Sequence, residues 1–84
     1  MNKQAEAVNY IQELLNKAGH RITPRKITIE DNQHWIIFKH NQKQIGIDSA
    51  SGIWVRGSES DDWRCYAAPY TVSGSIQAVE FLVT

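Results

Sequence analysis

Several side chains in this sequence are of types that perform chemistry, and their spacing decides which chemistry is open to them. Cys65 is the single cysteine among 84 residues, and no histidine stands near it in the sequence to act as a base. A lone cysteine in such a setting is typical of a small buried hydrophobic residue rather than a nucleophile. The segment Ser73-Gly74-Ser75 lacks the Gly-x-Ser-x-Gly pattern of a nucleophile elbow, and the sequence contains no glycine-rich phosphate loop. We therefore expect a protein without catalytic activity.

Metal binding finds no better support in the spacing of the histidine and acidic side chains. His34 and His40 fall on one expected strand, about 20 Å apart, so they cannot share an ion. Glu59, Asp61 and Asp62 offer carboxylate oxygens, but their spacing matches no known calcium loop and is typical of a solvated turn. We expect no metal and no cofactor.

Size and composition limit the fold to one small domain. The 84 residues include nine basic and nine acidic side chains, so the net charge is zero, and 42% of the residues are hydrophobic. Balanced charge argues against a protein dedicated to binding phosphate backbones. A single cysteine excludes an internal disulfide, and no apolar run is long enough for a membrane helix or a signal peptide. We expect a single domain over residues 1–84, located in the cytoplasm.

The elements that position these side chains begin and end with helices. Residues 1–19 have the 3.6-residue period of an amphipathic helix that ends at Gly19. Its apolar arc contains Ala7, Val8, Ile11, Leu14, Leu15 and Ala18. Residues 75–84 fit a short terminal helix capped by Ser73 or Ser75, and an alternating strand over residues 76–83 is the alternative. Residues 58–74 are expected to form a loop, with a short extended piece at Arg64–Ala67 left open.

Between the helices, residues 26–57 predict four antiparallel strands in a meander. Turns at Asn41-Gln42 and Asp31-Asn32, and a three-residue loop that ends with a left-handed Gly52, define the register. The expected cross-strand pairs are Phe38 with Ile45, Ile36 with Ile47, Ile27 with Ile36, Ile29 with His34, and Ile47 with Val55. The side chains that then face the helices are Ile27, Ile29, His34, Ile36, Phe38, Ile45, Ile47, Ile53 and Val55. The fold class is α+β, a two-layer sandwich of order αββββα.

The other face of this sheet carries large apolar side chains where a solvated sheet normally carries polar ones. Trp35, Ile37 and Trp54 lie together across its middle strands, and Gly46 between them leaves a shallow recess. Charged side chains rim the patch, as they do at many binding interfaces. The residues predicted to contact a partner are Trp35, Ile37, Lys39, Asp48, Trp54, Arg56 and Trp63.

Two interpretations of this patch are open. The chain covers it with its own residues, either Trp63, Tyr66 and Tyr70 or the terminal helix, or the patch binds a partner. In the second case we expect a protein-interaction module, an adaptor, inhibitor or subunit that forms a homodimer or binds a different protein. Single-stranded nucleic acid, with bases stacked on the tryptophans and phosphates on Lys39 and Arg56, is the less favoured partner.

Overall fold

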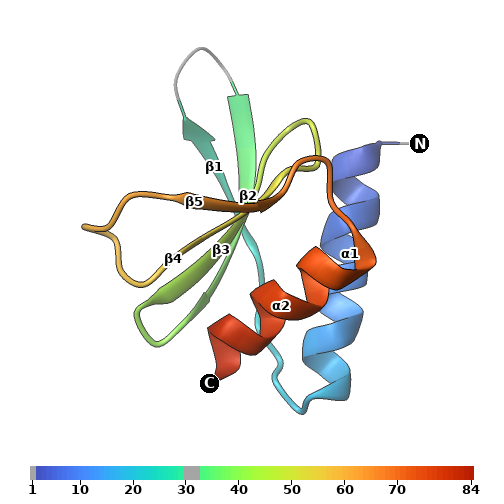
Figure 1. Ribbon diagram of the computed structural model, residues 1–84, viewed down its shortest axis with the longest axis vertical. Coiled ribbons are helices and arrows are strands. Elements are labelled where there is room, and N and C mark those ends of the chain that lie inside the picture. The colour runs from blue at the N-terminus through green and yellow to red at the C-terminus, as the bar shows by residue number, and fades with distance from the viewer. Residues whose placement is uncertain (1, 30–32) are drawn as a thin grey trace.

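The computed structural model describes residues 2–29 and 33–84, which form two helices and an antiparallel sheet. In chain order the elements are α1 (Lys3–Lys17), β1 (Arg25–Ile29), β2 (Gln33–His40), β3 (Lys43–Ile47), β4 (Ile53–Arg56), β5 (Arg64–Ala67) and α2 (Val72–Val83). The strand order is β1-β2-β3-β4-β5. Both helices pack on one face of the sheet, and among the described residues no helix covers the other face (Figure 1). The predicted two-layer α+β fold is confirmed, with five strands instead of four.

The fifth strand is the main departure from the predicted architecture. Arg64–Ala67, assigned to the loop at residues 58–74, pairs antiparallel with β4. This pairing satisfies backbone groups along the edge of β4 that would otherwise be open to solvent or to another chain. A bulge between Ile53 and Trp54 accompanies it. The connection between β4 and β5 therefore turns back toward the sheet instead of leaving it.

Helix α1 forms where the amphipathic pattern predicts a helix. The side chain of Asn2 caps its first turn by accepting a hydrogen bond from the backbone N–H of Gln4 at 2.8 Å. After the last turn, Gly19 adopts a φ of 84°, which is the left-handed conformation that commonly follows a helix. The helix also attaches directly to the sheet, because the amide of Gln4 donates to the backbone carbonyls of His34 and Ile47 at 2.7 and 3.2 Å.

Helix α2 is a helix and not a strand, but it begins earlier than predicted. Its cap is Thr71, whose hydroxyl oxygen accepts a hydrogen bond from the N–H of Gly74 at 2.9 Å. The predicted caps, Ser73 and Ser75, both lie inside the helix, and Ser75 is completely buried. Thr71, two residues before Ser73 and four before Ser75, offers the same capping oxygen, so the two serines are a misleading signal for the start of the helix.

The hydrophobic core lies between the sheet and the two helices, and we call it the helix-side core. Its buried members come from α1, β2, β3, β4 and α2, and they are Ala7, Ile11, Leu15, Phe38, Ile45, Ile47, Ile53, Val55, Ala78, Val79 and Leu82. Helix α2 approaches β5 closely at Gly74, because a Cβ at that position would stand only 2.7 Å from the Cβ of Ala67. Only a residue without a side chain allows this approach.

The register between β2 and β3 is as predicted. Phe38 pairs with Ile45 and Ile36 with Ile47. Asn41 enters the turn with a φ of 58°, a conformation that asparagine adopts more readily than most residues.

The register between β3 and β4 differs from the predicted one by two residues. Ile47 pairs with Ile53 and not with Val55, and Ser51 has the positive φ, 69°, that was expected at Gly52. The carboxylate of Asp48 sets this longer loop by accepting hydrogen bonds from the backbone N–H groups of Ala50 and Gly52 at 2.8 and 2.7 Å. Because side chains alternate with a period of two, the shift leaves every residue on its predicted face.

The register between β1 and β2 differs by one residue, and this error does exchange the faces. The expected turn at Asp31-Asn32 lies outside the described residues, but the strands on either side are described. Ile27 pairs with Trp35 and Ile29 with Gln33, so the predicted pairs with Ile36 and His34 are wrong. Ile27 and Ile29 therefore lie on the face away from the helices. There they are half-buried beside Trp35, which gives them apolar contact that an edge strand otherwise lacks.

Candidate protein-interaction surface

The sheet face opposite the helices, together with the loop at residues 57–63, forms what we call the outward surface. Its sheet residues are Arg25, Ile27, Ile29, Trp35, Ile37, Lys39, Gln44, Gly46, Trp54, Arg56 and Cys65. Strand alternation places them there, because alternate residues of a strand point to the same face and residues paired across neighbouring strands share a face. Five of the seven predicted contact residues belong to this sheet set, and the remaining two, Asp48 and Trp63, lie in the adjoining loops.

Three tryptophans form a cluster at the centre of the outward surface. The ring of Trp35 lies between the other two, with ring centroids 5.8 Å from Trp54 and 5.4 Å from Trp63. Gly46 forms the floor, because a Cβ there would be 2.8 Å from Trp35 and 3.0 Å from Trp63. The recess that the glycine leaves is thus filled by two indole rings from the same chain. Such ring contacts add stability beyond the area they bury.

The loop between β4 and β5 brings Trp63 onto this cluster. Trp63 leaves Trp35 with 9% of its surface exposed, and Ile37 beneath the same region is 6% exposed. Tyr66 and Tyr70, which were expected to join it, pack instead against the helix-side core, as does the terminal helix. Of the aromatic side chains expected to cover the patch, only Trp63 lies on it, and Trp54 and Trp63 stay half-buried at the surface.

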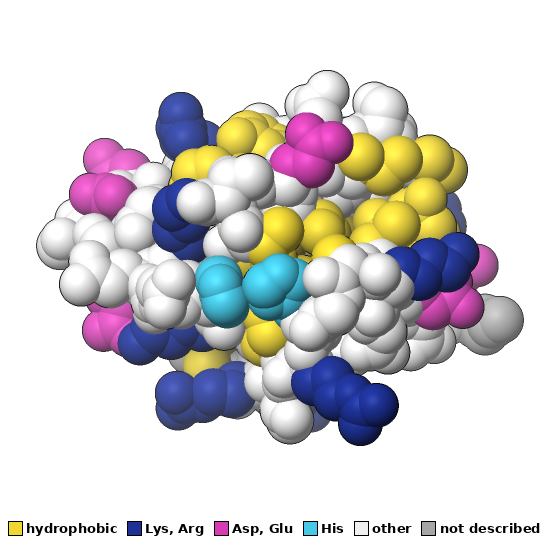
Figure 2. Space-filling model, turned by 90° about the horizontal axis from the view of Figure 1, so that it is seen from below, with side chains coloured by type: hydrophobic (Ala, Val, Ile, Leu, Met, Phe, Trp, Pro, Cys, Tyr) yellow, Lys and Arg dark blue, Asp and Glu magenta, His cyan; other side chains and the backbone are white. Residues whose placement is uncertain are grey.

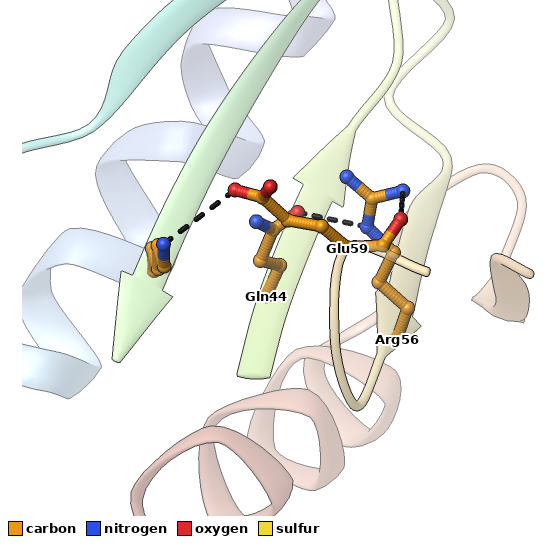
Figure 3. Close-up of polar contacts among 4 residues, drawn as sticks. Gln44, Arg56 and Glu59 are labelled. Carbon is orange, nitrogen blue, oxygen red and sulfur yellow. Dashed lines mark hydrogen bonds and ion pairs between the residues drawn. The ribbon is translucent and has the colours of Figure 1, made fainter. Parts of the chain in front are cut away.

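Arg56 organises the polar edge of the cluster. Its guanidinium lies over the ring of Trp63, 4.3 Å from the centroid, which is a favourable cation–π distance. Its Nε donates a hydrogen bond to the side-chain oxygen of Gln44 at 2.8 Å, and its Nη1 donates to the backbone carbonyl of Glu59 at 3.2 Å (Figure 3). Arg56 thus ties the β4–β5 loop to β3 and β4 and holds Trp63 in place.

Lys39 and Glu59 form an ion pair across the same edge. Their charged atoms are 3.5 Å apart, and their side chains are 46% and 72% exposed. In Figure 3 the side chain of Glu59 extends from the loop back over the sheet, and the dashed line from its carboxylate marks this ion pair. The pair is open to solvent, where an ion pair contributes little to stability.

Asp48 lies beside the cluster, but its carboxylate is occupied within the chain. One oxygen accepts the indole N–H of Trp54 at 2.8 Å, and the other accepts the two backbone N–H groups of its own loop. Asp48 therefore fixes the orientation of the Trp54 ring. Its contact with a partner stays a prediction, as do the partner contacts of all seven predicted residues.

The cysteine, histidine and acidic side chains with possible chemical roles lie in different parts of the structure. Cys65 is exposed on the outward surface, where its Cα pairs with Trp54, so the prediction of a buried cysteine is wrong. Glu59 forms an ion pair with Lys39. Among residues 2–29 and 33–84, no group of three or more histidine, cysteine or acidic side chains could hold a metal ion.

The histidines do not behave as a pair on one strand. His34 Nδ1 lies 3.2 Å from the hydroxyl of Thr28 on β1. His40 lies instead against His20, which follows α1, with ring centroids 4.9 Å apart. Figure 2 shows two adjacent histidine side chains beside a hydrophobic area. Sequence reasoning missed this contact, since nothing in the spacing of residues 20 and 40 indicates it.

Comparisons of the chain with protein-family models, with curated protein sequences and with solved structures give no match. In the part of the chain that the structure describes, no helix combines the length and the apolar character needed to cross a membrane. Because no similar protein indicates a function, the proposal for what the outward surface binds rests on the geometry of that surface.

Proposed function

We propose that this chain is a non-catalytic protein-interaction module, an adaptor, inhibitor or subunit that binds itself or another protein through the outward surface. The observation that carries the proposal is the tryptophan cluster on the sheet face away from both helices, with Arg56 stacked at its edge. Tryptophan and arginine are the residues most enriched among those that dominate interface energies. The single cysteine favours a reducing compartment, and we propose the cytoplasm.

Fewer of the predicted contact residues are accessible to a partner than the sequence suggests. Trp54 and Trp63 are half-buried and offer ring surface to a partner, whereas Trp35, which packs against both rings, and Ile37 are buried. The hydrogen bond from Trp54 to Asp48 holds one indole in a single orientation, and the contact with Arg56 does the same for Trp63. A preorganised anchor loses little side-chain entropy on binding, so these rings suit the role of contact residues.

The test compares the mass in solution, across a concentration series, of the wild type and the Trp54→Glu variant. A charged residue in a desolvated contact disrupts association, so we expect a wild-type dimer or a captured protein partner that Trp54→Glu loses. Val72→Glu is the matched control, because Val72 is 60% exposed on α2 and lies away from the outward surface. Circular dichroism confirms that each variant folds. Association that survives Trp54→Glu but not Val72→Glu would contradict the proposal.

Single-stranded nucleic acid is a second candidate, favoured by one specific observation. The cations Arg25, Lys39 and Arg56 line one hollow beside the tryptophans, so phosphates and stacked bases could meet the same surface. In that case an oligonucleotide quenches tryptophan fluorescence, and the affinity falls steeply as salt rises. Protein association through Trp54 depends much less on salt.

A further inference from the structure

Two hollows on the outward surface share the Lys39–Glu59 ion pair as part of their lining. The first, of about 140 Å³, is also lined by the cations Arg25 and Arg56 and by Ile27 and Ile37. The second, of about 320 Å³, is completed by residues of the β2–β3 turn and the β4–β5 loop, Gln42, Ser58 and Ser60. Because the ion pair lines both hollows, it lies on the boundary between them.

The ion pair that separates the two hollows is weak. The charged atoms of Lys39 and Glu59 are 3.5 Å apart, farther than the roughly 2.7–2.9 Å of a strong charge-assisted hydrogen bond. Both side chains are substantially exposed, and pairs of this kind hold their partners only weakly. Movement of the Glu59 side chain would join the two hollows into one groove that runs from β1 across β2, β3 and β4 to the β4–β5 loop.

The groove has the chemistry of a site for a carboxylate with apolar neighbours. Three cations, Arg25, Lys39 and Arg56, line the first hollow against the single carboxylate of Glu59, and its floor includes two isoleucines. Guanidinium groups are well matched to carboxylates, with which they form paired hydrogen bonds. The segment Ser58-Glu59-Ser60 already presents one carboxylate to this groove from within the chain.

We propose that the groove binds a protein segment carrying an aspartate or glutamate between apolar side chains, and that Glu59 occupies the carboxylate position until the partner displaces it. The inference rests on the proposed function and names the chemistry of its partner. A polyphosphate chain suits the groove less well, because Asp61 and Asp62 add two negative charges to the same loop as Glu59. A single carboxylate meets less of this repulsion than a continuous row of phosphates.

The experiment uses the full chain and three probes of known composition. The first is the blocked peptide acetyl-Leu-Ser-Glu-Ser-Leu-amide, the second is its glutamine twin, and the third is a short oligothymidine. Binding is followed by nuclear magnetic resonance, from the side-chain Nε–H signals of Arg25 and Arg56 and the indole N–H signals. The proteins are the wild type, Glu59→Gln, and Asp62→Asn, which removes one charge from the same loop at a residue that lines neither hollow.

We expect the glutamate peptide to shift both arginine signals saturably and the glutamine twin to leave them unchanged. Glu59→Gln should bind the glutamate peptide about two- to fivefold more tightly than the wild type, the factor that an exposed ion pair is worth. Asp62→Asn should bind like the wild type. The inference is overturned if Glu59→Gln binds no more tightly than Asp62→Asn, if the twin binds equally well, if only oligothymidine binds, or if no probe binds. Should protein association through Trp54 persist in those cases, the proposed function stands and only the groove assignment falls.

Discussion

The two faces of the sheet are stabilised in different ways. On the helix-side core, the side chains of Phe38, Ile45 and Ile47 are completely buried between β-strands and two helices. On the outward surface, Trp35, Trp54 and Trp63 pack on one another, Arg56 lies over Trp63, and Trp54 and Trp63 stay half-buried at the surface. Burial of apolar area drives folding, so the helix-side core carries most of the stability. The outward surface can therefore present large side chains to a partner without endangering the fold.

The largest expected effect on stability comes from a substitution in the helix-side core. Phe38→Ala should lower the free energy of unfolding by about 3–5 kcal/mol, because it removes a fully buried ring and leaves a cavity. That is a large part of the 5–15 kcal/mol available to a small domain. Chemical denaturation followed by circular dichroism measures the loss. A loss below about 1 kcal/mol would show that this face is not the stabilising one.

Gly74→Ala tests the close approach of α2 to β5. Helix propensity alone predicts a gain of about 1 kcal/mol for this change. We expect instead a loss of about 1–3 kcal/mol, since the new methyl group would stand 2.7 Å from the Cβ of Ala67 and the helix must move. Gln77→Ala, at an exposed position of the same helix, is the control and should change stability little. A stabilised Gly74→Ala variant would contradict this packing.

Trp63→Ala tests the loop that covers the outward surface. We expect a loss of about 1–2 kcal/mol, smaller than that of Phe38→Ala because Trp63 is only half-buried. The change also uncovers Trp35, so tryptophan emission should move to longer wavelength while the helices stay folded. A loss as large as that of Phe38→Ala would mean that the two faces contribute equally to the fold.

The smallest effect is expected at the rim. Glu59→Gln should change the free energy of unfolding by less than about 1 kcal/mol, because its ion pair with Lys39 is exposed to solvent. Thermal unfolding at low and high salt measures this directly. A larger, salt-sensitive loss of stability would show that the ion pair contributes substantially to folding. Glu59 could then not be displaced from the groove as easily as we propose.

Local signals explain which parts of the fold are predictable from the sequence. Helix α1 has a regular apolar arc and a glycine at its end, and the turn at Asn41-Gln42 has residues suited to it. Gly52 predicts a shorter loop before β4, whereas the side chain of Asp48 determines the loop by accepting hydrogen bonds from its backbone. An aspartate that precedes small residues is itself a turn signal.

Strand β1 shows why the rest could not be predicted. Its alternating residues Lys26, Ile27, Thr28 and Ile29 fit either register on an edge strand, and the apolar outward surface stabilises the one that was not expected. The course of the β4–β5 loop is also a long-range property. No local pattern places Trp63 on Trp35, or Glu59 on Lys39. The tryptophans were placed on the correct face, but how far they are covered depends on this loop.

The most direct measurement records nuclear magnetic resonance spectra of the chain across a concentration series and with any captured protein partner. If the outward surface is the binding surface, the indole N–H signals of Trp54 and Trp63 shift or broaden first, with the backbone signals of residues 57–63. The exposed face of α2, around Val72 and Ile76, then stays unchanged. Changes confined to α2, or no change on the outward surface under any condition that produces association, would contradict the central claim.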